Sequence, residues 1–397
     1  MQSDFSIRAG MVLEPDGPPL HDAVIRVSHG RITEIVSAAG AGRAQIDAPE
    51  CLAAPGFIDI HVHGGGGAWL MDGAVRSLEV VSRHLAQHGV TAYLVTTVTS
   101  PWDQHANAVA AARRYALSHQ NGRDGAAVLG CHLEGPFINP LRKGAQPEAF
   151  IRPPSIAELE SALGSDIEFV RIVTLAPEMV GAGDLIAYLG ARGIVSSIGH
   201  TDATAEQVFA AVELGARHVT HCYNAMRGLS SRDPGVVGAA MAHPALSAEL
   251  IWDNIHVHPT ACMALVRAKG SSGIMLISDG IPGSGMADGY RFSLGGLKAE
   301  VREGAARLPD GTLAGSLLTL DVAWRNAGIL DLQARTAMTS ANAARAIGMA
   351  ERKGALAPGR DADIVLLNQD GNVEVTIVAG RVVYAAPGFA ATMLDDT

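Results

Sequence analysis

The chain has 397 residues, of which 48% are hydrophobic and 18% charged, so we expect one large domain with a substantial core and a small accessory domain. A formal net charge of −10 provides no basic surface for nucleic acid, which we exclude as a partner. The four cysteines are scattered, no apolar run reaches membrane-spanning length and the N-terminus has no signal-peptide pattern, so we expect a cytoplasmic protein without a membrane partner.

Both ends of the chain alternate apolar and polar residues around turn signals, which is typical of β-strands. The predicted strands lie at residues 6–10, 23–27, 31–36, 363–367, 373–378 and 381–384. Neither end is long enough to form a core alone. We therefore expect residues 1–53 and 355–397 to pair into one small β-sandwich domain, with residues 54–354 forming the large domain between them.

The central region alternates between short apolar segments and segments of helix length. The apolar segments, which we predict to be strands, lie at about 57–62, 92–98, 127–133, 168–175, 193–199, 218–222, 248–253 and 273–278. The segments 75–88 and 205–214 are examples of the helices expected between them. Eight repeats predict an α/β fold with a closed, TIM-like (β/α)8 barrel, because a doubly wound sheet would need a switch point and usually has fewer strands.

Several of these strands end in residues that bind metals, at the rim where barrel enzymes place their catalytic groups. His61 and His63 close the first strand, and the period of two puts both imidazoles on one face, close enough to share a cation. Glu134, His200 and His221 close strands three, five and six. Two imidazoles and one carboxylate suit Zn²⁺ or Fe²⁺ and leave positions open for water, so we expect one or two divalent ions, with zinc favoured.

A proton carrier follows the eighth strand. A metal held at this rim lowers the pKa of its water to about 7 and polarises a carbonyl oxygen. Hydrolysis by metal-bound hydroxide still needs a group that takes the proton of the water and returns it to the leaving amine. Asp279, which precedes the glycine-rich segment 280–285, is placed to be this general base and acid.

Five motifs together resemble the signature set of the N-acetylglucosamine-6-phosphate deacetylases of the amidohydrolase superfamily. In chain order they are PGFIDIHVHG at 55–64, HLEGPF at 132–137, GHTDAT at 199–204, THCYNAM at 220–226 and LAGS at 313–316. The resemblance extends from about residue 50 to residue 385. It implies that the chain hydrolyses the N-acetyl group of N-acetylglucosamine 6-phosphate, giving glucosamine 6-phosphate and acetate.

The resemblance also implies further site residues. Asn224 and the backbone of Ala225 would contact this amino-sugar phosphate, and His256 and Arg232 would bind its phosphate. In this family Arg232 would reach across from a partner subunit, so a homodimer is expected. The forked guanidinium of an arginine suits a phosphate group. Family members with the pair equivalent to His61 and His63 can hold a second metal that shares the carboxylate.

Three residues depart from the family pattern. Gln146 stands where members usually carry a His that is thought to polarise the acetyl carbonyl; an amide can still donate a hydrogen bond to the substrate, but it cannot become cationic. Trp252 and Asn254 replace small residues and could reshape the sugar pocket. A deacetylase of a related N-acyl hexosamine phosphate, such as N-acetylgalactosamine 6-phosphate, therefore stays open as an alternative.

Two other classes are weaker alternatives. Cyclic-amide hydrolases of the dihydroorotase or hydantoinase type share the barrel and the H-x-H pair. Their sites hold two metals, which are bridged by a carboxylated lysine at the end of strand four. Here residues 170–177 read VRIVTLAP, without lysine. Gln146 motivates a sugar-phosphate-binding protein without turnover, but binding alone needs no proton carrier such as Asp279.

Overall fold

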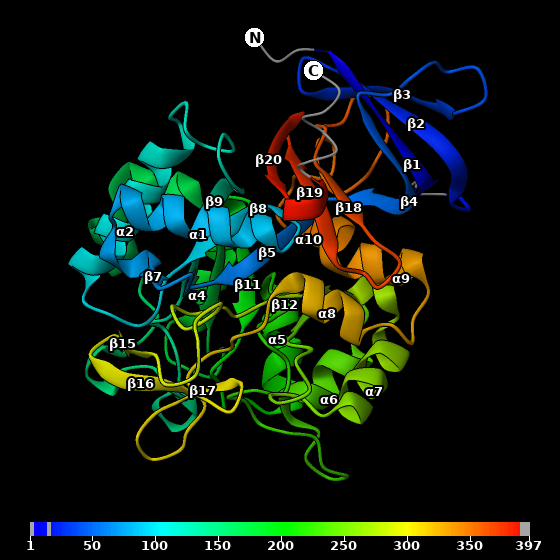
Figure 1. The fold of residues 1–397 in the computed structure, drawn as a ribbon. Helices are drawn as coiled ribbons and strands as arrows, with labels where there is room; N and C mark the ends of the chain where they lie inside the picture. The colour runs from blue at the N-terminus through cyan, green and yellow to red at the C-terminus, as the bar shows by residue number, and fades with distance from the viewer. Residues whose placement is uncertain (1–3, 14–16, 390–397) are drawn as a thin grey trace.

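The central part of the chain is a barrel of eight parallel strands in a computed structural model that describes residues 4–13 and 17–389 (Figure 1). The strands are β5 (Phe57–Val62), β8 (Val90–Thr96), β9 (Ala127–Glu134), β10 (Val170–Leu175), β11 (Val195–Ile198), β12 (His218–Val219), β13 (Ser247–Leu250) and β14 (Ile274–Leu276). The segment after β14 closes the barrel against β5, because the N–H of Asp279 donates to the carbonyl of His61 at 2.9 Å and that of His63 to Gly280 at 2.7 Å. The predicted (β/α)8 barrel is confirmed.

Helices surround the strands (Figure 1). They are α1 (Val75–Gln87), α2 (Trp102–Ala116), α3 (Ile156–Leu163), α4 (Ala182–Ala191), α5 (Ala205–Leu214), α6 (Gly235–Ala242), α7 (Pro259–Lys269), α8 (Leu320–Asn326), α9 (Leu332–Thr336) and α10 (Asn342–Ala346). In α1 the apolar residues Leu78, Val81 and Leu85 are buried against the barrel. Helix α5 has the predicted bounds because Thr204 and Gln207 form a capping box at its start and Gly215 follows its end. Short helical turns cover Leu70–Asp72, Pro140–Arg142, Glu148–Phe150, Gly164–Phe169, Ser271–Gly273 and Ala337–Ala341.

Strands from both ends of the chain form the small domain, as predicted, in one seven-stranded sheet. In the order of the sheet they are β20 (Arg381–Ala385), β19 (Val373–Val378), β18 (Ile364–Leu367), β4 (Ile46–Pro55), β1 (Phe5–Val12), β2 (Leu20–Ser28) and β3 (Arg31–Ser37). This sheet has a hydrophobic core of its own. The domain boundaries near residues 53 and 355 stay a prediction. The predicted outer bounds at residues 1 and 397 also stay a prediction, because residues 1–3 and 390–397 lie outside the described residues.

Strand β4 is central to this sheet, yet the sequence did not predict it. It pairs in parallel with β1 and antiparallel with β18, and so joins the two ends of the chain. The pairing with β1 shifts register between Ala9 and Met11, opposite Pro49. A Cβ at Gly10 would lie 2.0 Å from the carbonyl oxygen of Pro49, so this irregular pairing requires glycine there.

A buried ion pair fixes the end of the barrel domain to the small domain. Nζ of Lys353 lies 2.5 Å from Asp363 and 3.2 Å from Asp361, and all three side chains are almost fully buried. These carboxylates together outweigh the effect of burial and raise the pKa of Lys353.

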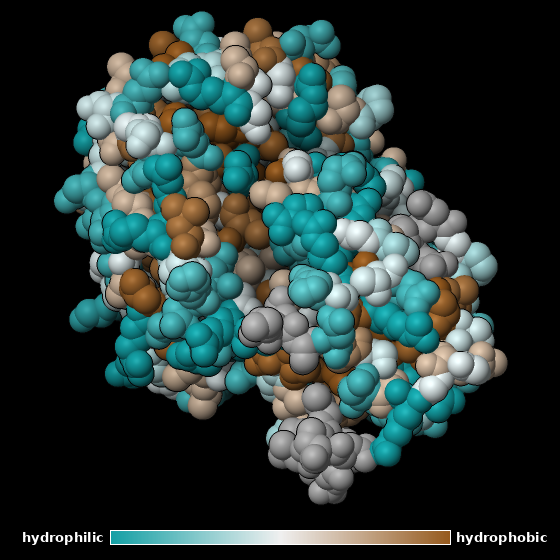
Figure 2. All heavy atoms as spheres, turned by 90° about the horizontal axis from the view of Figure 1, so that it is seen from above, coloured by the Kyte–Doolittle hydropathy of each residue, from teal (hydrophilic) through white to brown (hydrophobic). Residues whose placement is uncertain are grey.

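A three-stranded antiparallel insertion follows the eighth barrel strand. It consists of β15 (Arg291–Leu294), β16 (Leu297–Arg302) and β17 (Ala305–Arg307). A separate pair of short strands, β6 (Gly64–Gly65) and β7 (Ala68–Trp69), follows the first barrel strand. Viewed from above, the surface is largely hydrophilic with apolar side chains in between (Figure 2). Within the described ranges, no helix combines the length and the apolar character that a membrane span would need.

Candidate metal centre

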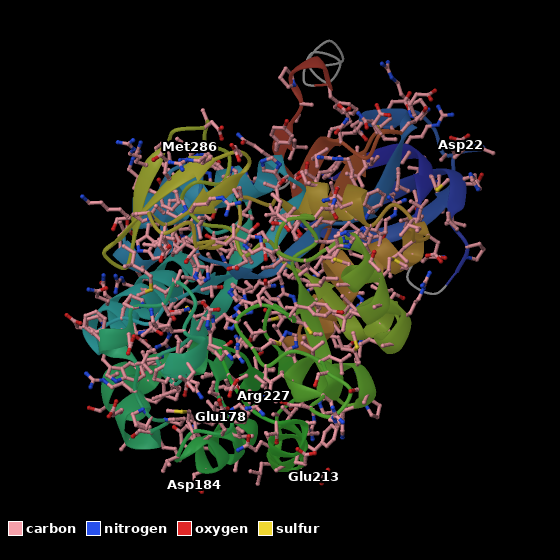
Figure 3. All side chains as sticks on the ribbon, turned by 90° about the horizontal axis from the view of Figure 1, so that it is seen from below. Asp22, Glu178, Asp184, Glu213, Arg227 and Met286 are labelled. Atoms are coloured by element: carbon pink, nitrogen blue, oxygen red, sulfur yellow. The ribbon has the colours of Figure 1, made fainter. Side chains whose placement is uncertain are left out.

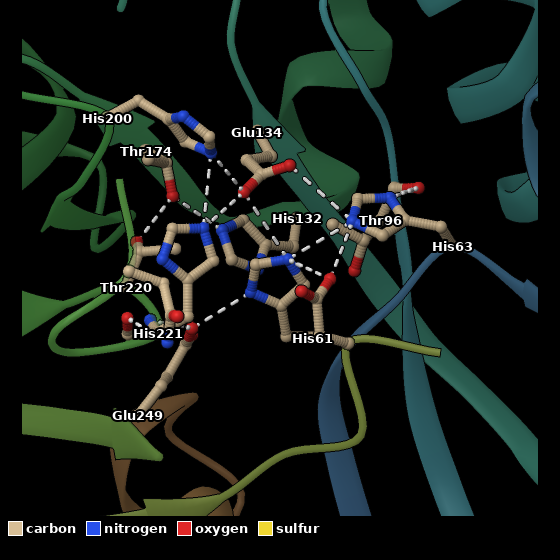
Figure 4. Close-up of polar contacts among 12 residues, drawn as sticks. His61, His63, Thr96, His132, Glu134, Thr174, His200, Thr220, His221 and Glu249 are labelled. Atoms are coloured by element: carbon tan, nitrogen blue, oxygen red, sulfur yellow. Dashed lines mark hydrogen bonds and ion pairs between the residues drawn. The ribbon is translucent and has the colours of Figure 1, made fainter. Parts of the chain in front are cut away.

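The predicted ligands lie together at the carboxyl-terminal rim of the barrel (Figure 4). Glu134 is the last residue of β9, whereas His200, His221 and Asp279 follow β11, β12 and β14 by two or three residues. These last three residues have positive φ angles of 46°, 29° and 49°. Non-glycine residues rarely adopt this conformation, and such strain is concentrated at functional sites.

Close packing below the rim fixes the turn at His200. Gly199 precedes it, and a Cβ at this position would lie 2.7 Å from Cβ of Thr220 and 2.8 Å from Cγ2 of Thr174. The carbonyl oxygen of His200 also accepts a hydrogen bond from the N–H of Asn139 at 2.9 Å. Strand packing and loop contacts therefore both orient this histidine.

Glu134, His200 and His221 form one group of potential ligands. Oε1 of Glu134 lies 3.0 Å from Nε2 of His200 and 2.9 Å from Nε2 of His221, and the two nitrogens are 3.1 Å apart. Ligands at about 2.0–2.1 Å from a tetrahedral zinc ion would be about 3.3 Å apart. The three atoms are thus close to the spacing that one ion requires.

His61, His63 and Asp279 form a second group next to the first. Nε2 of His61 and of His63 are 3.2 Å apart and lie 3.4 and 3.2 Å from Oδ1 of Asp279. Glu134 joins the two groups, because its Oε1 is 3.5 Å from His61 and its Oε2 is 3.5 Å from His63. The described residues therefore have room for one divalent ion or for two.

The second nitrogen of three of these imidazoles has an acceptor as its partner. Nδ1 of His61 donates to Glu249 at 2.8 Å, that of His63 to the carbonyl of Thr96 at 3.2 Å, and that of His200 to the carbonyl of Arg142 at 2.9 Å. In the neutral ring this leaves the lone pair on Nε2, directed at other lone pairs and at carboxylates. A cation resolves this arrangement, so the donor set fits a metal.

The carboxylates of the site attract positive charge, which either a proton on an imidazole or a metal ion can supply. Burial alone would lower the pKa of His61, but Glu249 and Glu134 outweigh it and raise the pKa to about 10. Burial would raise the pKa of Glu134, but His200 and His61 hold it well below its usual range. Burial would raise the pKa of Asp279, but the polar contact with His63 and the charge that His61 carries when it is protonated outweigh burial and lower it.

A cavity of about 280 Å³ opens above the two groups. Its walls include Asn224, Ala225 and His256, three of the residues predicted to bind substrate. Nδ1 of His256 donates to Asp253 at 2.6 Å, which orients the ring. Arg232 is exposed and is not among the described residues that line the cavity of its own chain.

Gln146 lines the same cavity, but both ends of its amide are engaged. Nε2 donates to Oε2 of Glu134 at 2.6 Å, and Oε1 accepts from the backbone N–H of Thr99 at 2.6 Å. The predicted contact with the substrate stays a prediction. Trp252 is buried and Asn254 exposed, and neither is among the described residues that line the cavity.

Sequence reasoning did not identify the residues that support the ligands. Glu249 on β13, His132 on β9 and His218 on β12 are fully or almost fully buried inside the barrel. Oε1 of Glu249 lies 3.2 Å from Nε2 of His218, and its Oε2 accepts from the backbone N–H of His221 at 3.1 Å. The available signal was their chemistry: polar residues within short apolar strands must have partners inside the fold.

Charged residues also connect the loops around the rim. Arg227 and Glu178, labelled in Figure 3, are both linked to Asp202. The carboxylate of Asp202 accepts from Arg227 at 2.8 Å and from Arg142 at 2.9 Å, while its backbone N–H donates to Glu178 at 2.7 Å. Since the carbonyl of Arg142 holds Nδ1 of His200, this network contributes to the position of a ligand.

The closed barrel, with convergent imidazoles and carboxylates at its catalytic rim, defines a metal-binding barrel enzyme. A model of the amidohydrolase family matches residues 52–383. The chain belongs to the amidohydrolase family, enzymes that hydrolyse carbon–nitrogen bonds and generally depend on divalent metals.

Individual relatives agree with this assignment. The chain is 40% identical to an N-acetylglucosamine-6-phosphate deacetylase of Bacillus subtilis over 347 residues, 86% of this chain and 87% of the relative. It is 39% identical to an N-acetylgalactosamine-6-phosphate deacetylase of Escherichia coli O157:H7, over 83% of this chain and 87% of the relative. A Mycobacterium smegmatis N-acetyl-D-glucosamine-6-phosphate deacetylase mutant, solved in complex with N-acetyl-D-glucosamine-6-phosphate, superposes with a TM-score of 0.90 at 31% identity, over 96% of this chain and 100% of the other.

Proposed function

We propose that the chain is a metal-dependent deacetylase that converts N-acetylglucosamine 6-phosphate and water into glucosamine 6-phosphate and acetate. The observation that carries this proposal is the convergence of Glu134, His200 and His221 below a cavity that Asp279 also lines. The similarity to deacetylases over most of both chains supports the substrate class. We further propose zinc as the metal and the cytoplasm as the location.

The residues of the chain would bind the substrate and move one proton. Asn224 and the backbone of Ala225 would hold the sugar, and Asp279 would take a proton from the attacking water and deliver it to the leaving nitrogen. The pKa of Asp279 lies below its ordinary value, so its carboxylate is ionised at neutral pH. A divalent ion held by Glu134, His200 and His221 would supply Lewis acidity toward the acetyl carbonyl and the water.

The phosphate would bind between two subunits of a homodimer, with His256 from one chain and Arg232 from the other. The exposure of Arg232 away from its own cavity supports this assignment. Measuring the mass in solution tests the dimer.

The decisive experiment measures acetate released from N-acetylglucosamine 6-phosphate before and after removal of metal by a chelator. We expect turnover that disappears in the metal-free protein and returns when Zn²⁺ is added. A protein that binds the sugar phosphate without releasing acetate would instead be a binding protein. Absence of metal-dependent release from every N-acetylated hexosamine phosphate would refute the proposal.

A second candidate substrate is N-acetylgalactosamine 6-phosphate. The identities to the Bacillus subtilis and Escherichia coli relatives, 40% and 39%, do not separate the two sugars. A comparison of kcat/KM for the glucosamine, galactosamine and mannosamine derivatives decides which epimer fits the cavity. A higher kcat/KM for the galactosamine derivative would favour the second candidate.

A further inference from the structure

The carboxylate of Glu249 contacts both groups of potential ligands from inside the barrel (Figure 4). It is fully buried on β13. Its Oε2 accepts from Nδ1 of His61 at 2.8 Å and from the backbone N–H of His221 at 3.1 Å. One oxygen therefore holds a side chain of the second group and the strained backbone of a ligand in the first.

Glu249, His61 and His132 also lie close enough together to suggest a third metal site, but their atoms are already engaged. Nδ1 of His132 donates to the carbonyl of Ile60 at 3.0 Å, so its Nε2 accepts from the hydroxyl of Thr174 at 2.8 Å. Nδ1 of His61 carries the hydrogen that it donates to Glu249. No lone pair of these two rings is left for a cation between them, and we conclude that this cluster supports the site above it.

Glu249 also changes the balance of charge. Together with Glu134, Asp279 and Asp59, which accepts from the backbone N–H of His61 at 3.2 Å, it places four carboxylates in or below the site, all of them buried. One divalent ion compensates two negative charges, and an uncompensated buried charge is costly. A second cation beside His61 and His63 would contact the oriented Nε2 lone pair of His61. It would also compensate the negative charge that the first ion leaves.

We propose that Glu249 is a positioning residue that determines whether a second divalent ion binds between His61, His63 and the shared Glu134. It fixes the tautomer of His61, so that Nε2 faces the ion, and it supplies part of the compensating charge. This inference rests on the proposed function only in taking Glu134, His200 and His221 as the site of the first ion.

The test is a titration of the full-length, metal-stripped protein with Zn²⁺, in which bound zinc per chain is measured by equilibrium dialysis and elemental analysis. The wild type should bind two ions. Glu249→Gln keeps the size of the side chain and an oxygen that accepts from His61 and from the backbone N–H of His221, but it removes the charge. We expect the second ion to bind about 10–100-fold more weakly, which is the usual effect of changing a partner of a ligand, while the first ion keeps its affinity.

Two further variants make the result specific. Glu249→Asp keeps the charge but withdraws it from His61, and it should also weaken the second ion, so it decides the matter if Glu249→Gln does not fold. Asp321→Asn is the matched control, because Asp321 is also a buried carboxylate but lies on α8, where it bonds His88 and Arg325 rather than a residue of the site. It should leave both zinc affinities unchanged.

Three results would overturn the inference: a wild type that never binds more than one ion, wild-type zinc binding in both Glu249 variants, or the same loss in Asp321→Asn. Acetate release separates this inference from the proposed function. If acetate release depends on metal but the Glu249 variants bind zinc as the wild type does, the proposed function holds and the inference is wrong. Loss of the second ion in a protein that releases no acetate would show the opposite.

Discussion

Replacing Asp279 with Asn should separate proton transfer from metal binding. The substitution keeps the shape of the side chain, and the backbone bonds of residue 279 to His61 and Ser316 do not depend on the carboxylate. The side chain contacts His61 and His63 at 3.4 and 3.2 Å and is not part of the first group of ligands. The ion at Glu134, His200 and His221 should therefore remain bound.

The expected loss in kcat is about 10²–10⁴-fold, the usual contribution of a general acid and base. At about 1.36 kcal/mol for each factor of ten, this corresponds to about 3–5 kcal/mol of transition-state stabilisation. Asp279 is only 8% exposed, so bulk water has little access to replace it as the proton acceptor. The full loss should appear in kcat, with a smaller change in KM.

The assay measures acetate release and bound metal on the same preparation of Asp279→Asn. Asp321→Asn is the matched control, because Asp321 is also a buried carboxylate, at 8% exposure, but lies on α8, where it bonds His88 and Arg325. It should keep the turnover of the wild type. Wild-type turnover in Asp279→Asn, or loss of the ion from the first group, would show that the role of Asp279 is misassigned.

Two more predictions concern phosphate binding and stability. Arg232→Ala should raise KM for the phosphorylated sugar and change little for unphosphorylated N-acetylglucosamine, because its guanidinium is assigned to the phosphate; equal effects on both substrates would refute that role. Burial raises the pKa of Asp321, but the hydrogen bond and charge of His88 outweigh it and lower the pKa to about 2. Because the folded pKa lies below the unfolded one, the Asp321 carboxylate stabilises the fold above about pH 4 and loses this effect as the pH falls toward 2. Asp321→Asn should therefore lower the free energy of unfolding by about 2 kcal/mol at pH 7 and by less at pH 3. Urea unfolding at both pH values measures the difference, and an equal loss at both would contradict the assignment.

The barrel could be predicted because its signals are local. Each strand is a short apolar segment followed by a turn, and eight of them leave one simple topology. The convergence of His200, His221 and Asp279 could be predicted for the same reason, since they follow their strands by two or three residues and parallel strands bring their carboxyl ends to one rim. Strand β4 lacks such a signal: Pro49 and its alanines disfavour a strand, and long-range pairing with β1 and β18 overrides that preference.

The supporting contacts depend on distances that no motif encodes. Glu249 and His61 are 188 positions apart, and their bond exists because β13 and β5 project both side chains into the same barrel. The sequence does show a carboxylate within the short strand Ser247–Leu250, and a charge buried in a barrel needs partners. It does not show which of the nearby histidines provides them. The register of the strands places His61 and His218, and not His132, against the carboxylate of Glu249. Because Nδ1 of His61 donates to Glu249, the lone pair on Nε2 of His61 is free for a metal.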